Sequence, residues 1–128
     1  MTDFAETMPL AKLLGISTSV ASKEKVLGHL TVAEDVCTIG SSVHGGTLMA
    51  FADSVAAIGA FLNLPDGASG TTTIESKTNF LGRAQSGDQL LATSTPLSVG
   101  RRLSVWQTRI TGKDEKLIAV ITQTQLVL

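Results

Sequence analysis

Hydrophobic and polar positions divide the chain into a first half with helical segments and a second half whose pattern is typical of strands. Residues 4–14 form a predicted short helix that ends near Gly15, a residue type common just after helix C-termini. Apolar and polar side chains alternate over residues 24–32, which predicts a strand. The long apolar segment 47–64 has helical composition and ends at the turn-forming sequence 65–67, Pro-Asp-Gly.

Everything after this turn is expected to form strands. Thr-rich and β-branched stretches are separated by glycine-containing breaks at hairpin spacing. In the last stretch, the alternation is expected to run through Ile118, Val120, Thr122 and Thr124. The four expected strands cover residues 70–81, 88–99, 103–111 and 117–128.

This order of elements predicts one α+β domain over residues 1–128. A long central helix would be wrapped by a curved antiparallel sheet of five to six strands. The central helix is apolar on every side, so we expect the sheet to enclose it.

Composition narrows the class of protein. Charged residues are 16% and hydrophobic residues 43% of the 128 residues, which argues against disorder and hints at oligomerisation. The net charge of −1 gives no basic surface for nucleic acid or anionic lipid. One cysteine, an N-terminus without signal-peptide features and an apolar stretch too short to span a bilayer predict a cytoplasmic location.

Asp53 is the anomaly in this pattern, because it lies in the middle of the apolar helix. A carboxylate is costly to bury without partners, so its presence there needs a reason. At 100° per residue it shares a helix face with Met49 and, seven residues earlier, with Gly46. The alternative is that Asp53 caps a second helix beginning at Ser54.

The start of the central helix offers further chemistry. Free backbone N–H groups and the helix dipole favour negative charge there, and Gly45 and Gly46 allow a ligand to approach the backbone. His44 adds an imidazole, although a lone histidine is more often a structural residue. Together these residues predict a site with an oxyanion-type donor, an imidazole and a carboxylate.

The sequence Val-His-Gly-Gly-Thr-Leu-Met-Ala-Phe-Ala-Asp, residues 43–53, resembles the signature of the hotdog-fold acyl-CoA thioesterases, in particular the PaaI-like (phenylacetyl-CoA) group. Residues 72–81 and the sequence Gly-Arg-Arg at 100–102 resemble later elements of that family, and the order of elements agrees along nearly the whole chain. The resemblance implies a hotdog fold and hydrolysis of small to medium acyl- or aryl-CoA esters. It further implies a homodimer or homotetramer with active sites at the subunit interface.

The resemblance also implies residue roles. The Gly45 N–H would polarise the thioester carbonyl, and Asp53, contributed across the dimer interface, would act as general base or nucleophile. His44 would orient substrate or water. A hydroxyl from the next strand would complete the site, with Thr73 the best match and Thr72 one register away. Many family members have an Asn shortly before the His, where this chain offers Ser41 or Ser42 instead.

The arginines are candidates for the nucleotide end of coenzyme A, because the guanidinium fork suits phosphate. Arg83, Arg101 and Arg102 are expected in loops or turns, where a solvated role is equally reasonable. Coenzyme A is then part of the substrate, and no cofactor or metal is expected, since His29, His44 and Cys37 are the sole soft ligands in the sequence.

Two other functions remain open from the sequence. One is an acyl-CoA-binding hotdog module without turnover, which Asp53 disfavours. The other is a hotdog enoyl-CoA hydratase or dehydratase, which also uses a His and an acidic residue but at a different spacing. The residues Met49, Phe51, Phe61, Phe80 and Trp106 are candidates either for an acyl pocket or for the core.

Overall fold

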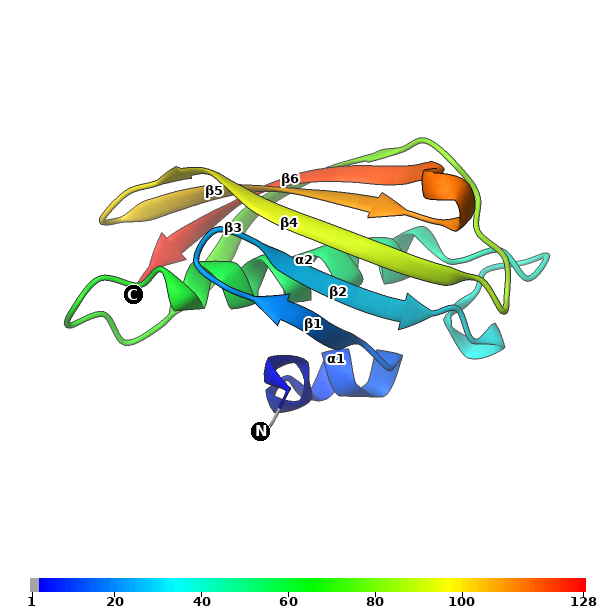
Figure 1. Ribbon diagram of the computed structural model, residues 1–128, viewed down its shortest axis with the longest axis horizontal. Coiled ribbons are helices and arrows are strands. Elements are labelled where there is room, and N and C mark those ends of the chain that lie inside the picture. The colour runs from blue at the N-terminus through cyan, green and yellow to red at the C-terminus, as the bar shows by residue number, and fades with distance from the viewer. Residues whose placement is uncertain (1–2) are drawn as a thin grey trace.

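The computed structural model describes residues 3–128. One long helix, α2 (Gly45–Leu62), packs against one face of a six-stranded antiparallel sheet (Figure 1). The sheet order is β1-β2-β4-β5-β6-β3, so β3 is an edge strand although it follows α2 directly in the chain. The strands are β1 (Ser17–Ala21), β2 (Val26–Thr31), β3 (Thr71–Phe80), β4 (Gln89–Val99), β5 (Leu103–Thr111) and β6 (Leu117–Val127).

The predicted fold class is confirmed, with six strands. The central helix begins at Gly45, two residues before the expected start, because His44 caps it, and it ends at Leu62. The helix is continuous through Asp53, so the alternative of a second helix beginning at Ser54 is wrong. By length and composition alone α2 could cross a membrane, but here it is the core helix of the sheet.

The N-terminal segment forms two short helices rather than one. A 3-10 turn, η1 (Phe4–Thr7), precedes α1 (Pro9–Leu14), and Pro9 occupies the start of α1, where its missing N–H costs nothing. Asp3 holds this segment to β1 by accepting hydrogen bonds from the backbone N–H and the hydroxyl of Thr18, at 2.8 and 2.5 Å. Figure 1 shows both helices beside β1, at the edge opposite β3. Two further 3-10 turns are η2 (Glu34–Val36) and η3 (Lys113–Glu115).

Helix and sheet approach closely where side chains are small. A Cβ at Gly59 would lie 2.5 Å from the Trp106 ring, and one at Gly28 would lie 2.4 Å from Val55. Trp106 and Phe51 are fully buried, which assigns them to the core. Met49, Phe61 and Phe80 stay partly exposed, so the sheet covers α2 on one side and does not enclose it as expected.

In the last strand, the alternation through Ile118, Val120, Thr122 and Thr124 does not mark the side that faces the core. Its inward side chains after Ile118 are Ala119, Ile121, Gln123 and Gln125, whereas Val120, Thr122 and Thr124 are half-buried. The pairing of β5 with β6 is irregular near the start of β6, where Ile110 pairs with Ala119 but Thr111 pairs with Leu117. Ile118 is the extra residue, and both Ile118 and Ala119 are buried. The core side of this strand therefore ends in two glutamines.

Candidate active site

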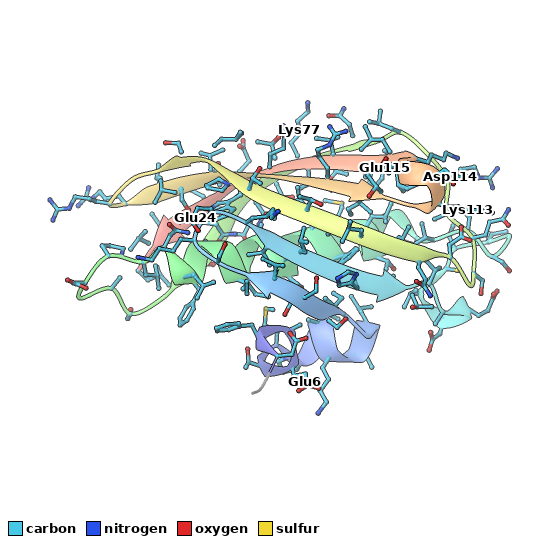
Figure 2. The ribbon with its side chains drawn as sticks, in the orientation of Figure 1. Glu6, Glu24, Lys77, Lys113, Asp114 and Glu115 are labelled. Atoms are coloured by element: carbon cyan, nitrogen blue, oxygen red, sulfur yellow. The ribbon has the colours of Figure 1, made fainter. Side chains whose placement is uncertain are left out.

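The uncovered side of α2 forms a stripe of residues spaced three or four apart. Such spacing places them on one face of the helix. We call this the open stripe; it consists of Gly46, Met49, Asp53, Ala57 and Phe61, all exposed or half-buried. Figure 2 labels several charged side chains, Lys77 and Glu115 among them, that lie on the outside of the fold. Asp53 differs from these because its carboxylate is bonded to side chains of the sheet.

Asp53 is held by two donors from different strands. The Thr73 hydroxyl donates to Oδ1 of Asp53 at 2.6 Å, and Nε2 of Gln123 donates to the same oxygen at 3.0 Å. Thr73 in turn accepts from Nε2 of Gln125 at 2.7 Å. These hydrogen bonds offset the desolvation cost of placing a carboxylate in an apolar helix.

The strand β3 brings its hydroxyls to α2 by a change of register. An irregularity between Thr73 and Glu75 leaves Ile74 exposed and turns Thr71, Thr73, Ser76 and Thr78 towards the interior. Thr72 lies on the other side of β3 and is exposed. The structure therefore brings Thr73, and not Thr72, to Asp53 within one protomer.

His44 caps the start of α2. Its Nδ1 accepts a hydrogen bond from the Gly46 N–H at 2.8 Å, so the ring is neutral and carries its proton on Nε2. This contact uses the Gly46 N–H. The neighbouring Gly45 N–H has no acceptor among residues 3–128, and a Cβ at Gly45 would lie 3.2 Å from the Phe80 ring.

Gly45 and Asp53 are far apart within one protomer. Eight residues separate them along α2, which corresponds to about 12 Å at the helical rise of 1.5 Å per residue. A base that acts through one water reaches about 6 Å, two hydrogen-bond lengths. Groups two helical turns apart are therefore poorly placed to act on one carbonyl within a single copy of the chain.

The expected phosphate-binding arginines also separate. Arg101 and Arg102 line a surface hollow with Pro65 and Asp66, beyond the C-terminal end of α2. Arg83 is exposed in the loop after β3, next to Ala84, whose carbonyl accepts from the Val43 N–H near the helix start. All three side chains are exposed, but they lie at opposite ends of the helix.

The loop before α2 uses its polar groups internally. Ser41 donates to Glu34 at 2.8 Å, and Ser42 contacts the Ala84 carbonyl at 3.4 Å.

Burial, with Glu34 and Asp35 nearby, raises the pKa of the Cys37 thiol, which disfavours a nucleophilic thiolate. Among residues 3–128, no group of three His, Cys, Asp or Glu side chains is placed to hold a metal ion.

Two apolar or mixed hollows flank the open stripe. The larger, of about 530 Å³, is almost wholly apolar; it includes Ala57, one helical turn beyond Asp53. Its other lining residues are Phe4, Thr7, Met8, Ile58, Phe61, Gly70 and Thr71. The smaller hollow, of about 330 Å³, adjoins His44 and Gly46. An apolar hollow one helical turn from a fixed carboxylate is suited to hold an acyl chain or an aromatic ring.

Sequence reasoning missed Gln123 and Gln125. A glutamine in a strand is ordinarily expected on the solvent side, since glutamine is seldom fully buried. The available signal was their spacing of two residues in a strand whose same side begins with Ala119 and Ile121. Two amides on the core side of a strand indicate a polar partner inside the fold.

Comparisons with known proteins agree with the fold. Residues 40–119 match the family model described as the thioesterase superfamily. A 1,4-dihydroxy-2-naphthoyl-CoA thioesterase of Arabidopsis thaliana is 32% identical over 108 residues, covering 84% of this chain and 67% of that protein. A 1,4-dihydroxy-2-naphthoyl-CoA hydrolase of Listeria monocytogenes is 31% identical over 114 residues, covering 88% and 90%. The crystal structure of a Haemophilus influenzae thioesterase superimposes with a TM-score of 0.85 at 26% identity, covering 93% of this chain and 82% of that one.

Proposed function

The chain belongs to the thioesterase superfamily and is an acyl-CoA thioesterase, and we propose that it hydrolyses small to medium aryl- or acyl-CoA esters at a site shared by two copies. The observation that carries this proposal is the carboxylate of Asp53, fixed by Thr73 and Gln123 in an otherwise apolar helix. No contact in the packing of α2 requires a charge at this position. A reaction that consumes water does require a base or a nucleophile there.

The reaction needs two groups on opposite sides of one carbonyl. The Gly45 N–H polarises the thioester oxygen, as an unpaired donor at a helix start can. Asp53 takes a proton from water as the water oxygen attacks the carbonyl carbon, or attacks that carbon itself to give an anhydride that water then opens. In either route the C–S bond breaks, the acid is released and the proton ends on the coenzyme A thiol.

A two-fold pairing of β3 with a second β3 supplies both groups. As an edge strand of ten residues, β3 has one side free to pair, and Ile74, Phe80 and Leu81 on or beside it are exposed. Gly45 lies next to Phe80 at one end of β3, where a Cβ on Gly45 would be 3.2 Å from the ring, and Asp53 is bonded to Thr73 near the other end. Antiparallel pairing therefore sets Asp53 of one protomer opposite the partner subunit's Gly45. The same pairing covers the open stripe.

The larger hollow supports the proposed substrate class. Its apolar lining one turn from Asp53 suits an aromatic ring or a short acyl chain, with Met49 and Gly46 on the same stripe beside the reacting carbonyl. His44 stays at the helix start, where its Nε2–H is free to orient substrate or water. In the pairing described, Arg83 of one protomer lies at the same end of the dimer as the partner subunit's Arg101 and Arg102, a cluster suited to the coenzyme phosphates.

The test is thiol release from a panel of coenzyme A esters that includes phenylacetyl-CoA, benzoyl-CoA and 1,4-dihydroxy-2-naphthoyl-CoA. We expect release with the wild-type chain, and loss of about 10²- to 10⁴-fold in Asp53→Ala, the range for a positioned acid–base group. Binding without release would support a non-catalytic module, and loss of enoyl-CoA absorbance without thiol would support a hydratase. Wild-type rates in Asp53→Ala would reject the mechanism.

A further inference from the structure

The amides of Gln123 and Gln125 lie inside the fold beside Asp53. Their side chains are 0% and 1% exposed, on the core side of β6 after Ile121. A buried amide destabilises a fold unless its donors and acceptors are bonded. The position of these two side chains therefore needs an explanation in terms of their partners.

The direction of each hydrogen bond follows from counting protons. An ionised carboxylate only accepts, so Thr73 must give its single hydroxyl proton to Asp53, at 2.6 Å. The Thr73 oxygen can then only accept, which fixes Nε2 of Gln125 towards it at 2.7 Å. The Oε1 of Gln125 is left to accept from the Thr71 hydroxyl at 3.1 Å, and that hydroxyl also faces the Leu126 carbonyl at 3.0 Å. Gln125 and Thr73 thus form a chain of donors directed at Asp53.

The same reasoning fixes the orientation of the Gln123 amide, but this orientation leaves one of its atoms without a partner. Its Nε2 faces Oδ1 of Asp53 at 3.0 Å, and its Oε1 is buried without a hydrogen-bond partner among residues 3–128. Turning the amide over would place Oε1 against the carboxylate oxygen, where both atoms only accept. An unsatisfied buried atom of this kind is uncommon in native folds and calls for an explanation; the hydroxyls of Ser76 and Thr78 on β3 are likewise buried without a partner among residues 3–128.

The two donors act on one oxygen of the carboxylate. Within residues 3–128, the hydrogen bonds to Asp53 end on Oδ1, and none ends on Oδ2. We propose that Gln123 is a positioning residue which, together with Thr73, anchors Oδ1 and leaves Oδ2 as the oxygen that acts on water or on the thioester. This inference rests on the proposed function, since it assigns the working atom of the same site.

The test is a double-mutant cycle between Gln123 and Asp53, measured as kcat and KM for thiol release. Gln123→Met keeps the length of the side chain and removes the donor. We expect kcat to fall about 10- to 100-fold, the loss that corresponds to removing a hydrogen bond to a charged group. KM should change less than about threefold. In an Asp53→Asn background the same substitution should change the residual kcat by less than about twofold, because Gln123 acts through the carboxylate.

A matched control removes another buried polar pair from the same sheet. The Thr108 hydroxyl donates to Ser94 at 3.0 Å, and both side chains are fully buried. The double variant Ser94→Ala/Thr108→Val removes both partners and should keep the wild-type kcat. If Gln123→Met does not fold, Gln123→Asn keeps an amide that is too short to reach Asp53 and should show the same loss.

The outcomes separate this inference from the function on which it rests. A wild-type chain that releases no thiol from any ester rejects the proposed function. An active wild-type chain with an unchanged kcat in Gln123→Met overturns the positioning role alone, and so do equal losses in the wild-type and Asp53→Asn backgrounds. A loss that is confined to the background with an intact Asp53 supports the positioning role.

Discussion

The hydroxyl of Thr73 lies 2.6 Å from Oδ1 of Asp53, which joins the edge strand β3 to the core helix α2 at a single carboxylate. The contact depends on the register irregularity between Thr73 and Glu75, because that irregularity exposes Ile74 and keeps Thr73 turned inward. The strand on which a second copy is proposed to dock therefore also holds the proposed catalytic group. The proposed docking and the proposed catalysis thus share one element.

Thr73→Val should lower kcat about 10- to 100-fold, since it removes a hydrogen bond to a charged group without changing side-chain volume much. Steady-state thiol release measures the effect. Thr124→Val is the matched control, because Thr124 is a half-buried threonine on the neighbouring strand β6, on the side away from Gln123 and Gln125. Equal kcat values for Thr73→Val and the wild type would show that Asp53 does not need this donor.

Much of the fold could be predicted from the sequence, because local patterns decide it. The apolar segment before Pro65 and the glycine-separated strands identify the helix and the hairpins, and Asp53 is conspicuous in its apolar surroundings. The face of β6 could not be predicted in this way. Its core side ends in glutamines, and the other side, with Thr122 and Thr124, resembles a β-branched interior.

The partners of Asp53 required the tertiary structure. Thr73 is 20 residues away in the chain and Gln123 is 70 residues away, and they meet through the pairing of β3 with β6. Thr73 could be predicted because the family resemblance places a hydroxyl on that strand. Gln123 was missed, since its one local signal is its spacing behind Ala119 and Ile121, and that spacing does not by itself decide which side of β6 faces the core.

The Gly45 N–H can be removed while the helix is retained. Proline is well suited to the first position of a helix, and His44 before it is already extended, at φ −69° and ψ 136°. Gly45→Pro should lower kcat about 10²- to 10³-fold, the range for loss of one oxyanion donor. Gly45→Ala is the control, because it keeps the N–H and puts a Cβ at the same distance from Phe80.

A mixture of Gly45→Pro and Asp53→Asn chains tests whether the site is shared. Each variant alone should be nearly inactive, whereas refolding them together should restore thiol release, because some mixed dimers carry one intact site. Rates that stay at the level of the separate variants, in samples shown to contain mixed dimers, would contradict a site built from two chains. Gly45→Ala with the same loss as Gly45→Pro would instead assign the effect to crowding against Phe80.

His44 is expected to have a capping role that can be measured apart from catalysis. His44→Ala removes the acceptor for the Gly46 N–H and should cost about 1 kcal/mol of stability, as loss of an N-cap does. His44→Asn keeps a capping acceptor and should restore the unfolding midpoint. A kcat that stays low in His44→Asn would assign His44 a role towards substrate, and a kcat that recovers would assign it to the cap alone.

The arginines at the two ends of α2 are predicted to contact the phosphates of coenzyme A and not the reacting carbonyl. Arg83→Ala and the double variant Arg101→Ala/Arg102→Ala should each raise KM for coenzyme A esters about tenfold or more, as loss of charge-assisted hydrogen bonds does, with kcat little changed. The N-acetylcysteamine ester of the same acid lacks the nucleotide, so its KM should be the same for wild type and variants. Arg109→Ala is the control, because Arg109 is also exposed but lies within β5, away from both ends of the helix. An increase in KM for both kinds of ester would place these arginines near the acyl group rather than the nucleotide.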